Sequence, residues 1–226
     1  MKRSEINRYI AEADAFFTRN GFVLPPLAHW SPEDWRRRGS EAGELRAAGL
    51  GWDVTDFHSG SFPSVGLTLF TLRNGSPASD QPTKTYAEKI MFVREGQVTP
   101  FHYHVCKTED IIHRGGQGTG RLALQLYNSD ENGGFAQTPV SVFCDGIERR
   151  LDPGATLILD PGESITLTPR LYHKFYAIEG DCLVGEVSSL NDDATDNYFK
   201  DPLPRYPAIL EDEPPTRLLC NEYPTS

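Results

Sequence analysis

Residues 96–116 read GQVTPFHYHVCKTEDIIHRGG, with two histidines and a glutamate inside an eight-residue window. Side chains alternate between the two faces of a strand, so His102 and His104 should point the same way. Glu109 follows after a short turn and can reach the same point in space. A later run, TPRLYHKF (168–175), adds His173 after another strand-like segment. Imidazole and carboxylate groups suit a divalent metal, so these residues predict a metal site in a β-rich protein.

A single histidine is more often a surface or hydrogen-bonded residue than a ligand. The remaining histidines fit that description: His29, His58 and His113. The pair His102 and His104 differs from them because Glu109 follows at ligand spacing and glycines bracket the group. We therefore interpret the pair as metal ligands.

Helical spacing precedes the strand-like part of the chain. Ser4 could cap a helix that ends near Asn20. Its apolar positions recur at helical intervals: Ile6, Tyr9, Ile10, Ala13, Phe16 and Phe17. The run SPED (31–34) is a second helix start, with a cap, a proline at the first position and acids in the first turn. Residues 41–48 could form another short helix.

From Trp52 onward, short apolar runs alternate with glycine, proline, asparagine and aspartate. The expected strands are 65–72, 87–93, 122–127, 140–144, 155–159, 164–167, 173–178 and 182–187. So many short strands favour a closed barrel or a double-sheet sandwich. We expect one domain over residues 1–226. It would comprise a helical extension (1–50), a barrel (51–200) and an extended, proline-rich tail (201–226).

Composition limits the possible partners. The chain has 226 residues, of which 38% are hydrophobic, enough for one sizeable core. A net charge of -10 argues against nucleic acids and anionic membranes as partners. The first residues contain no apolar run, so we expect no signal peptide, no membrane span and a cytoplasmic location.

The spacing Gly96-x5-His102-x-His104-x4-Glu109-x6-Gly116 resembles the first motif of the cupin superfamily. Residues 162–173 resemble the second motif, with altered spacing. The resemblance implies a mainly-β fold, a cupin-type antiparallel jelly-roll barrel that holds a metal inside it. Carried over by motif, the metal ligands are His102, His104, Glu109 and His173.

Further stretches across nearly the whole chain resemble bacterial D-lyxose isomerases. They are AHWSPEDW (28–35), GWDVTDF (51–57), LFTLRNG (69–75), YAEKI (86–90), KTEDII (107–112), PGESITL (161–167), GEVS (185–188) and NDD (191–193). The resemblance implies a manganese-dependent homodimer that interconverts D-lyxose and D-xylulose and often accepts D-mannose and D-fructose. The same ligands would also accept Co²⁺, Ni²⁺, Fe²⁺ or Zn²⁺. The chain departs from the family pattern at Val105 and His113, which we expect at the rim of the site or directly behind it.

Isomerisation of a 2-hydroxy aldehyde needs a base that moves a proton from C2 to C1. Glu186 is the candidate, because it is a lone acid in the strand-like run VGEV (184–187). Alternation along a strand does not reveal which face Glu186 occupies, so an outward-facing surface acid is the alternative. The family resemblance favours the base.

Three more polar residues are candidates for contacts with the sugar. Lys107 lies between two predicted ligands in the sequence and could stabilise negative charge on oxygen, which makes it a catalytic candidate. Lys89 begins the apolar run KIMFV (89–93) and could bind substrate. A solvated lysine at a strand end is the alternative for both. Asp193 could bind distal hydroxyls, although the run NDD also forms turns.

Three other functions compete with the sugar isomerase. An iron-dependent cupin dioxygenase could use the same ligand types, but four protein ligands leave fewer open positions than a facial triad. A phosphosugar isomerase is disfavoured by the acidic charge and by the lack of clustered Arg and Lys residues. A non-catalytic sugar-binding cupin would not need both Lys107 and Glu186 beside a complete ligand set.

Overall fold

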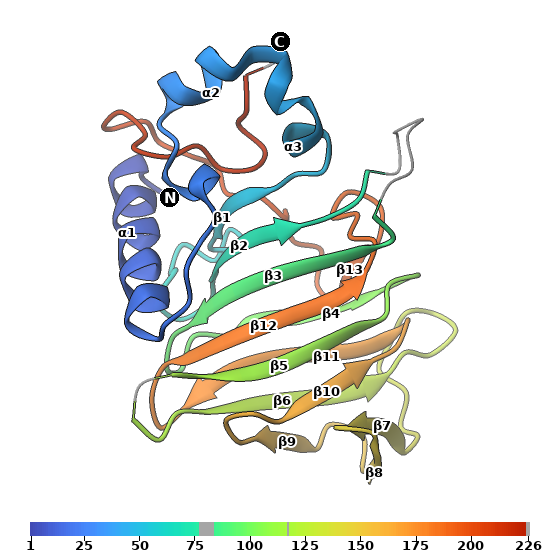
Figure 1. Ribbon diagram of the computed structural model, residues 1–226. Coiled ribbons are helices and arrows are strands. Elements are labelled where there is room, and N and C mark those ends of the chain that lie inside the picture. Colours follow the sequence, from blue (N-terminus) through green and yellow to red (C-terminus); the bar gives the residue numbers. More distant parts are fainter. Residues whose placement is uncertain (77–83, 117, 225–226) are drawn as a thin grey trace.

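The computed structural model describes residues 1–76, 84–116 and 118–224 (Figure 1). The helical elements are α1 (Arg3–Arg19), η1 (Pro26–His29), α2 (Pro32–Arg38), η2 (Gly39–Ala42) and α3 (Gly43–Ala47). The strands are β1 (Gly51–Thr55), β2 (Leu67–Arg73), β3 (Tyr86–Val93), β4 (Thr99–His104), β5 (Glu109–Gly116), β6 (Arg121–Asn128), β7 (Val140–Cys144), β8 (Ile147–Leu151), β9 (Thr156–Leu159), β10 (Ser164–Leu167), β11 (Leu171–Ile178), β12 (Cys182–Ser189) and β13 (Asn197–Phe199).

The strands form two antiparallel sheets. The larger sheet has the order β1-β2-β3-β12-β5-β10-β7-β8, and the smaller has the order β13-β4-β11-β6-β9. Neighbouring strands in the sheets are frequently distant in the sequence, as in the pairing of β12 with β3 and β5. The predicted mainly-β architecture of antiparallel strands with N-terminal helices is confirmed.

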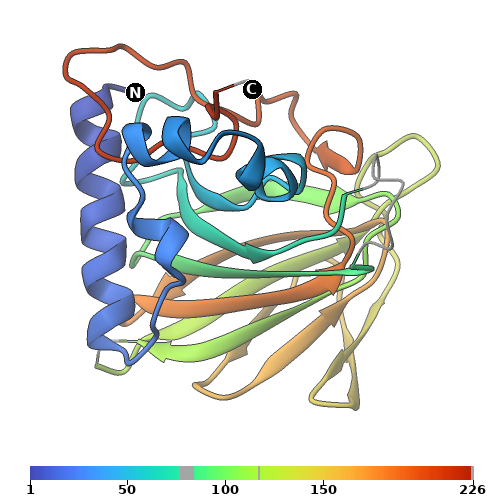
Figure 2. The ribbon, with the colours of Figure 1, turned by 45° about the horizontal axis from the view of Figure 1, so that its top comes forward.

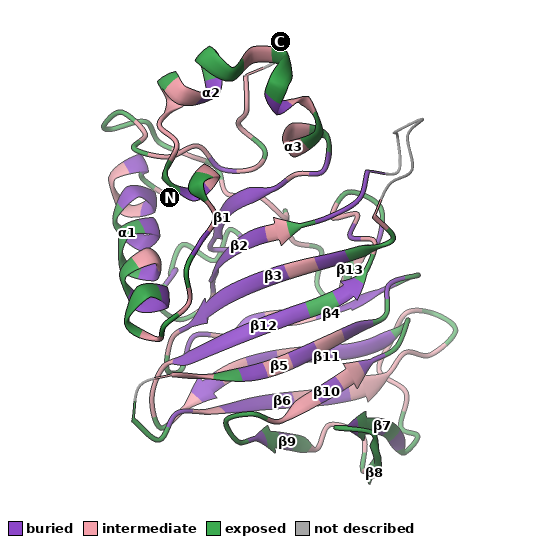
Figure 3. Cartoon of the chain, in the orientation of Figure 1, coloured by how far each residue is buried: buried purple, intermediate pink, exposed green. Residues whose placement is uncertain are grey.

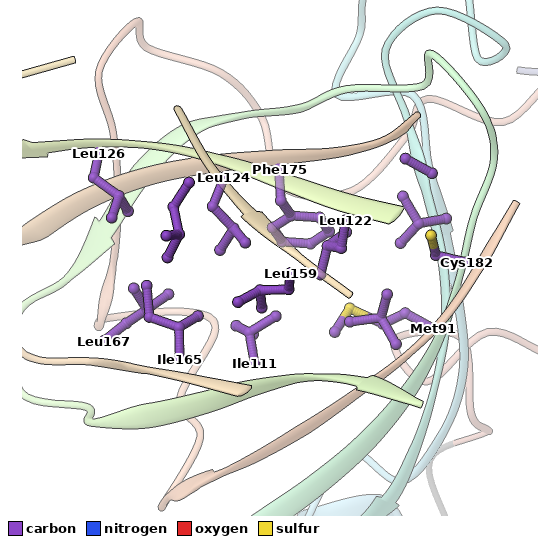
Figure 4. Close-up of a cluster of buried hydrophobic side chains, with 14 of the residues drawn as sticks. Met91, Ile111, Leu122, Leu124, Leu126, Leu159, Ile165, Leu167, Phe175 and Cys182 are labelled. Atoms are coloured by element: carbon purple, nitrogen blue, oxygen red, sulfur yellow. The ribbon is translucent and has the colours of Figure 1, made fainter. Parts of the chain in front are cut away.

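The main core fills the space between the two sheets (Figure 4). Leu124 of β6 and Phe175 of β11 point from the smaller sheet towards Ile111 of β5 and Ile165 of β10 on the larger one. These strands follow a period of two, so alternate side chains enter the space between the sheets. Further along the two sheets, inward-pointing positions hold polar residues instead, and these supply the side chains of the site.

A second core lies on the outer face of the larger sheet, under α1 (Figure 2). Phe16 of α1 stacks on Phe92 of β3 with ring centroids 4.1 Å apart. Met91, one position earlier, points into the inter-sheet core instead. Figure 3 shows the result: β3 and β12 are buried along most of their length, β8 is largely exposed, and β7 and β9 alternate buried and exposed residues. None of the described helices combines the length and apolar character needed to cross a membrane.

Several expected boundaries differ in the structure. Lys2, not Ser4, is the N-cap of α1, and Ser4 instead binds the side chain of Asp212 in the C-terminal tail. The expected helix 41–48 is split into η2 and α3 at Gly43, a residue that favours helix breaks. Ser31 does cap α2, as predicted, and accepts a hydrogen bond from the backbone N–H of Asp34.

Five strands were not predicted by the apolar runs: β1, β4, β5, β8 and β13. Of these, β4 was implied only by the alternation of His102 and His104. β8 has the sequence IERRL, which is exposed along its length and carries no alternating pattern. β13 has three residues and depends on pairing with β4. Such strands are held by their partners rather than by their own apolar residues, so sequence patterns miss them.

The two ends of the chain are fastened together beside α1. Arg3, buried in the first turn, forms ion pairs with Glu211 and Glu222 of the C-terminal tail. Asn7 donates to Glu213 (2.6 Å) and accepts from the backbone N–H of Thr216 (2.9 Å). The tail is thereby held against the body of the protein, which matters because part of it reaches the functional site.

Arg3→Ala should lower the free energy of unfolding by about 1–3 kcal/mol, because it leaves two carboxylates without their buried partner. The lower part of that range is expected, since Glu211 is 56% exposed and water can replace the lost contact. Arg8→Ala on the same helix is the matched control. Its pair with Glu12 is exposed, so the change should stay within about 0.5 kcal/mol. Equal effects of the two substitutions in denaturant unfolding would contradict this account.

Candidate metal centre and active site

Three histidines gather on the inner face of the smaller sheet. His102 and His104 occupy alternate positions of β4, and His173 on β11 is paired in register with His102. Cross-strand neighbours on one face have Cβ atoms about 4.5–5.5 Å apart, which brings the imidazoles together. Their candidate ligand atoms all lie within 4.8 Å of one another.

Glu109 completes the group from the facing sheet. It is the first residue of β5, and its side chain points inward across the space between the sheets. Its Oε2 lies 3.4 Å from His104 Nε2, and its Oε1 lies 3.1 Å from His173 Nε2. The position of Glu109 at the very start of the strand explains how it reaches the histidines soon after β4 ends.

Backbone carbonyl groups orient two of the imidazoles. His102 Nδ1 lies 2.9 Å from the carbonyl oxygen of Pro100, and His173 Nδ1 lies 3.1 Å from that of Leu171. A carbonyl oxygen can only accept, so each Nδ1 carries the proton and each Nε2 presents a lone pair. This is the arrangement that histidine ligands adopt around a metal.

The protonation states of these residues also suit a metal. Burial, with smaller contributions from His173 and His104, holds the pKa of His102 well below its ordinary value, and burial lowers the pKa of His104 as well. Burial alone would raise the pKa of Glu109, but Lys107, His104 and His173 together outweigh it, lower the pKa and keep this carboxyl ionised. Neutral imidazole and carboxylate are the forms that bind metal.

His173 Nε2 provides a further test of fit. This atom is buried and has no hydrogen-bond partner among the described residues, although it lies close to Glu109. Leaving a buried polar atom unpaired costs about 1–3 kcal/mol, so such atoms usually have a functional reason. A divalent ion bound by His102, His104, Glu109 and His173 would use this lone pair, and the donor set fits such an ion.

Glu186 of β12 faces Lys89 of β3 directly in the strand register. Lys107 Nζ donates to Glu186 Oε1 (2.8 Å) and lies 2.7 Å from Glu109 Oε2. Lys89 Nζ is 3.2 Å from the same Glu186 Oε1. All four side chains are buried, so these charges interact strongly.

The pKa values of these linked charged groups follow from the ion pairs between them. Burial alone would raise the pKa of Glu186, but Lys107 and Lys89 outweigh it and lower the pKa. Burial alone would lower the pKa of Lys107, but Glu109 and Glu186 raise it above its ordinary value. At neutral pH the site therefore contains ammonium and carboxylate groups, with Glu186 in the form that can accept a proton.

Asn191 joins the two lysines. Its Oδ1 accepts from Lys89 Nζ (2.7 Å) and from Lys107 Nζ (3.3 Å). Asn74 fixes the backbone of Asn191 in turn, through hydrogen bonds to its N–H (3.1 Å) and to its carbonyl oxygen (2.9 Å). Asn191 lies in the run NDD (191–193), but no local pattern assigns it a role, because that role depends on contacts with distant strands.

Asp193 and Arg205 extend the polar wall. Asp193 accepts from Asn197 Nδ2 (3.0 Å), and its Oδ2 is 3.7 Å from Arg205 Nη2. Burial alone would raise the pKa of Asp193, but Lys89 and Arg205 lower it below its ordinary value. Arg205, in the C-terminal tail, also pairs with buried Asp53 of β1. No motif singled out Arg205, which lies in the proline-rich segment.

All eight of the candidate site residues line one cavity: His102, His104, Glu109, His173, Lys107, Glu186, Lys89 and Asp193. The cavity contains about 460 Å³ of empty space, part of it open to solvent, and apolar residues such as Phe57 and Phe199 also line it. A cavity in which polar groups converge beside apolar side chains is typical of a small-molecule site. The alternative of solvated lysines is wrong for Lys89 and Lys107, which are buried.

The two departures from the family pattern lie outside this cavity lining. Val105 is 42% exposed. His113 is fully buried, and backbone groups engage both ring nitrogens: Nδ1 accepts from the N–H of Gly115 (3.2 Å) and Nε2 donates to the carbonyl oxygen of Gly120 (2.9 Å). Of the two places expected for His113, the rim is therefore wrong, because its buried side chain binds the backbone at the end of β5 and just beyond it.

Comparisons with known proteins identify the relatives of this chain. The family model described as D-lyxose isomerase matches residues 1–223. A D-lyxose/D-mannose isomerase from Serratia proteamaculans is 50% identical over 99% of this chain and 98% of its own length. One from Escherichia coli O157:H7 is also 50% identical, over the same shares of the two chains.

Solved structures show the same fold at much lower identity. An L-ribose isomerase from Acinetobacter sp. DL28, in complex with L-ribose, superimposes with a TM-score of 0.57 at 15% identity. One from Cellulomonas parahominis gives a TM-score of 0.56 at 16% identity. Each comparison covers 93% of this chain and 98% of the other. The match to the family model and the identity to curated relatives show that this chain belongs to the D-lyxose isomerase family.

Proposed function

We propose that this protein is a metal-dependent aldose–ketose isomerase that interconverts D-lyxose and D-xylulose, and D-mannose and D-fructose. The observation that carries the proposal is the position of Glu186. Its carboxylate lies in the same cavity as three histidines and Glu109, and Lys107 bridges the two glutamates. A base, a cation and a ligand set for a divalent ion are thus present together, as the isomerisation requires.

The four side chains His102, His104, Glu109 and His173 would hold the divalent ion, with Mn²⁺ as the proposed metal. When bound, it would supply Lewis acidity towards the oxygens on C1 and C2 of the sugar. The fixed Nδ1–H groups of His102 and His173 keep these rings in the orientation for binding.

Glu186 has one oxygen free for proton transfer. Both lysines contact Oε1, whereas Oε2 has no ion pair or hydrogen bond with the described residues. We assign Oε2 as the atom that takes the proton from C2. The electrons of the broken C–H bond form the C1–C2 double bond, and the electrons of the C1 carbonyl move to O1, which gives an enediolate. A proton then passes from the hydroxyl on C2 to O1, the carbonyl forms at C2, and Glu186 Oε2 returns its proton to C1. A positioned base of this kind contributes about 10²–10⁴-fold in rate.

The lysines have different roles in this proposal. Lys107 lies between Glu109 and Glu186 and so beside the reacting carbons, where its ammonium group would stabilise negative charge on oxygen. Lys89 contacts Glu186 and Asn191 and would hold the base in place and contact substrate. Asp193 would accept a hydrogen bond from a sugar hydroxyl.

The proposal is tested by incubating the purified protein with D-lyxose, D-mannose and a phosphosugar, with and without Mn²⁺, while oxygen is recorded. We expect ketose from the two neutral sugars, dependence on metal, no turnover of the phosphosugar and no oxygen consumption. Oxygen uptake would instead support a dioxygenase, and sugar binding without turnover would support a non-catalytic cupin.

We also expect the protein to form a homodimer through barrel and extension contacts, as the family resemblance implies. Apolar side chains exposed on β7 and β8, Phe143 and Ile147, add surface that a second copy could cover. Light scattering should give twice the chain mass of 25.2 kDa at both low and high concentration. A single 25.2 kDa species at each concentration would contradict the prediction.

A further inference from the structure

Arg205 is a cavity residue supplied by the C-terminal tail, far from the motifs that define the site. It lines the same cavity as Lys89, Glu186 and Asp193. Its side chain is only 13% exposed and is held by an ion pair with Asp53 of β1. An arginine buried beside a polar cavity is costly to place, so its role needs an explanation.

One end of the guanidinium is free. Nη2 contacts Asp53 and lies 3.7 Å from Asp193, whereas Nη1 is buried without a hydrogen-bond partner among the described residues. Asp53 Oδ1 is also unpartnered, but Asp53 does not line the cavity. Of these two unpartnered atoms, Arg205 Nη1 therefore belongs to the residue that lines the cavity.

The charge around Arg205 favours a neutral ligand. Two carboxylates, from Asp53 and Asp193, accompany a single guanidinium, so the group as a whole is not cationic. A phosphate would be repelled by this pair of acids, whereas a hydroxyl can accept a hydrogen bond from Nη1 at no electrostatic cost.

Arg205 also lies beyond the reacting groups. In the described residues, no ion pair or hydrogen bond joins it to Glu186 or to the four candidate metal ligands. Its connection to them runs through Asp193, on whose carboxylate Lys89 and Arg205 both act. A sugar with C1 and C2 beside Glu186 would thus present its far end to Arg205.

We propose that Arg205 is a specificity-determining residue that donates a hydrogen bond from Nη1 to a distal hydroxyl of the sugar, on C4 or C5. Asp53 and Asp193 hold the guanidinium in position for this contact. The inference rests on the proposed isomerase function, because that function fixes which end of the sugar lies beside Glu186.

The test compares D-lyxose with 4-deoxy-D-lyxose and 5-deoxy-D-lyxose on the wild type and on Arg205→Met. A hydrogen bond to a charged group corresponds to roughly 10-fold to 100-fold in kcat/KM. Wild type should lose this factor on one deoxy sugar. Arg205→Met should lose it on D-lyxose, mainly through a higher KM, and should no longer distinguish that deoxy sugar from D-lyxose. Arg205→Lys should recover part of the loss, since an ammonium group can donate to the same hydroxyl.

Controls separate binding from folding. Asp53→Asn combined with Arg205→Met avoids a buried unpaired carboxylate, and should show the same loss of discrimination. Arg217→Met is the matched control in the tail, because the only side-chain hydrogen bond of Arg217 in the described residues goes to the adjacent Thr216 carbonyl. It should behave as wild type.

Two results would overturn the inference. One is a wild type that converts both deoxy sugars as well as D-lyxose, which needs no variant to observe. The other is an Arg205→Met or double variant that keeps the full penalty on the deoxy sugars. A wild type that isomerises no aldose at all would refute the proposed function instead, so the two failures are distinguishable.

Discussion

His102→Ala or Glu109→Ala should abolish both bound metal and isomerase activity. Each removes one of four converging groups, and the remaining ones are too few to hold the ion in a fixed geometry. The loss in metal affinity should exceed about 100-fold, the upper end for removing a residue that only supports a ligand. Elemental analysis of the purified variants, together with ketose formation from D-lyxose, measures both effects.

A surface histidine gives the control for this prediction. His29 is half-exposed and lies 3.6 Å from Asp14 on α1, so His29→Ala should keep metal and activity. Chelation of the wild type should also lower its thermal stability, because metal binds only the folded state; saturation at 100 times Kd corresponds to about 2.7 kcal/mol. A demonstrably metal-free protein with full activity would refute the metal-dependent mechanism.

Glu186→Gln should reduce turnover by roughly 10²-fold or more while metal content stays near that of the wild type. The amide keeps the shape of the side chain but cannot accept the proton at the Oε2 position. Lys107 would still pair with Glu109, and Lys89 would still donate to Asn191, so the cavity should remain intact. Substrate KM should change little. Steady-state kinetics on D-lyxose tests this.

Glu88→Gln is the matched control for the base. Glu88 precedes Lys89 on β3, so its side chain takes the opposite face, where it pairs with Arg73. Its substitution should leave turnover unchanged.

Isotope labelling separates the proton route from a hydride shift. With proton transfer through Glu186, deuterium from solvent should enter C1 of the ketose during turnover. A hydride shift would carry the C2 hydrogen across without exchange. Complete retention of that hydrogen together with a fully active Glu186→Gln would make this carboxylate structural.

The sequence by itself determined the ligand candidates and the type of fold. His102 and His104 are two positions apart on one strand, so local alternation alone places them on the same face. Regular apolar runs likewise predicted the buried strands β3, β6 and β12, because each of these strands contains its own inward-pointing apolar residues. Local geometry sufficed for these features because they depend on neighbours in the chain.

The tertiary structure decided which face of each strand meets the cavity. A lone acid such as Glu186 is equally compatible with either face until β12 is paired with β3 and β5 in the larger sheet and one face of that sheet is packed against the smaller one. Only that pairing sets Glu186 opposite Lys89 and brings Lys107 to the same oxygen.

The roles of site residues outside the strands also could not be predicted from the sequence. Asn191 and Arg205 have no periodic pattern, and their contacts come from Asn74, Lys89 and Asp53, which lie more than 100 residues earlier in the chain. His113 lies inside the motif of residues 96–116, yet its side chain does not line the cavity and instead binds the backbone of Gly115 and Gly120. Side-chain roles that depend on such long-range contacts follow from the packed fold, because no local property of the sequence specifies which distant groups will meet.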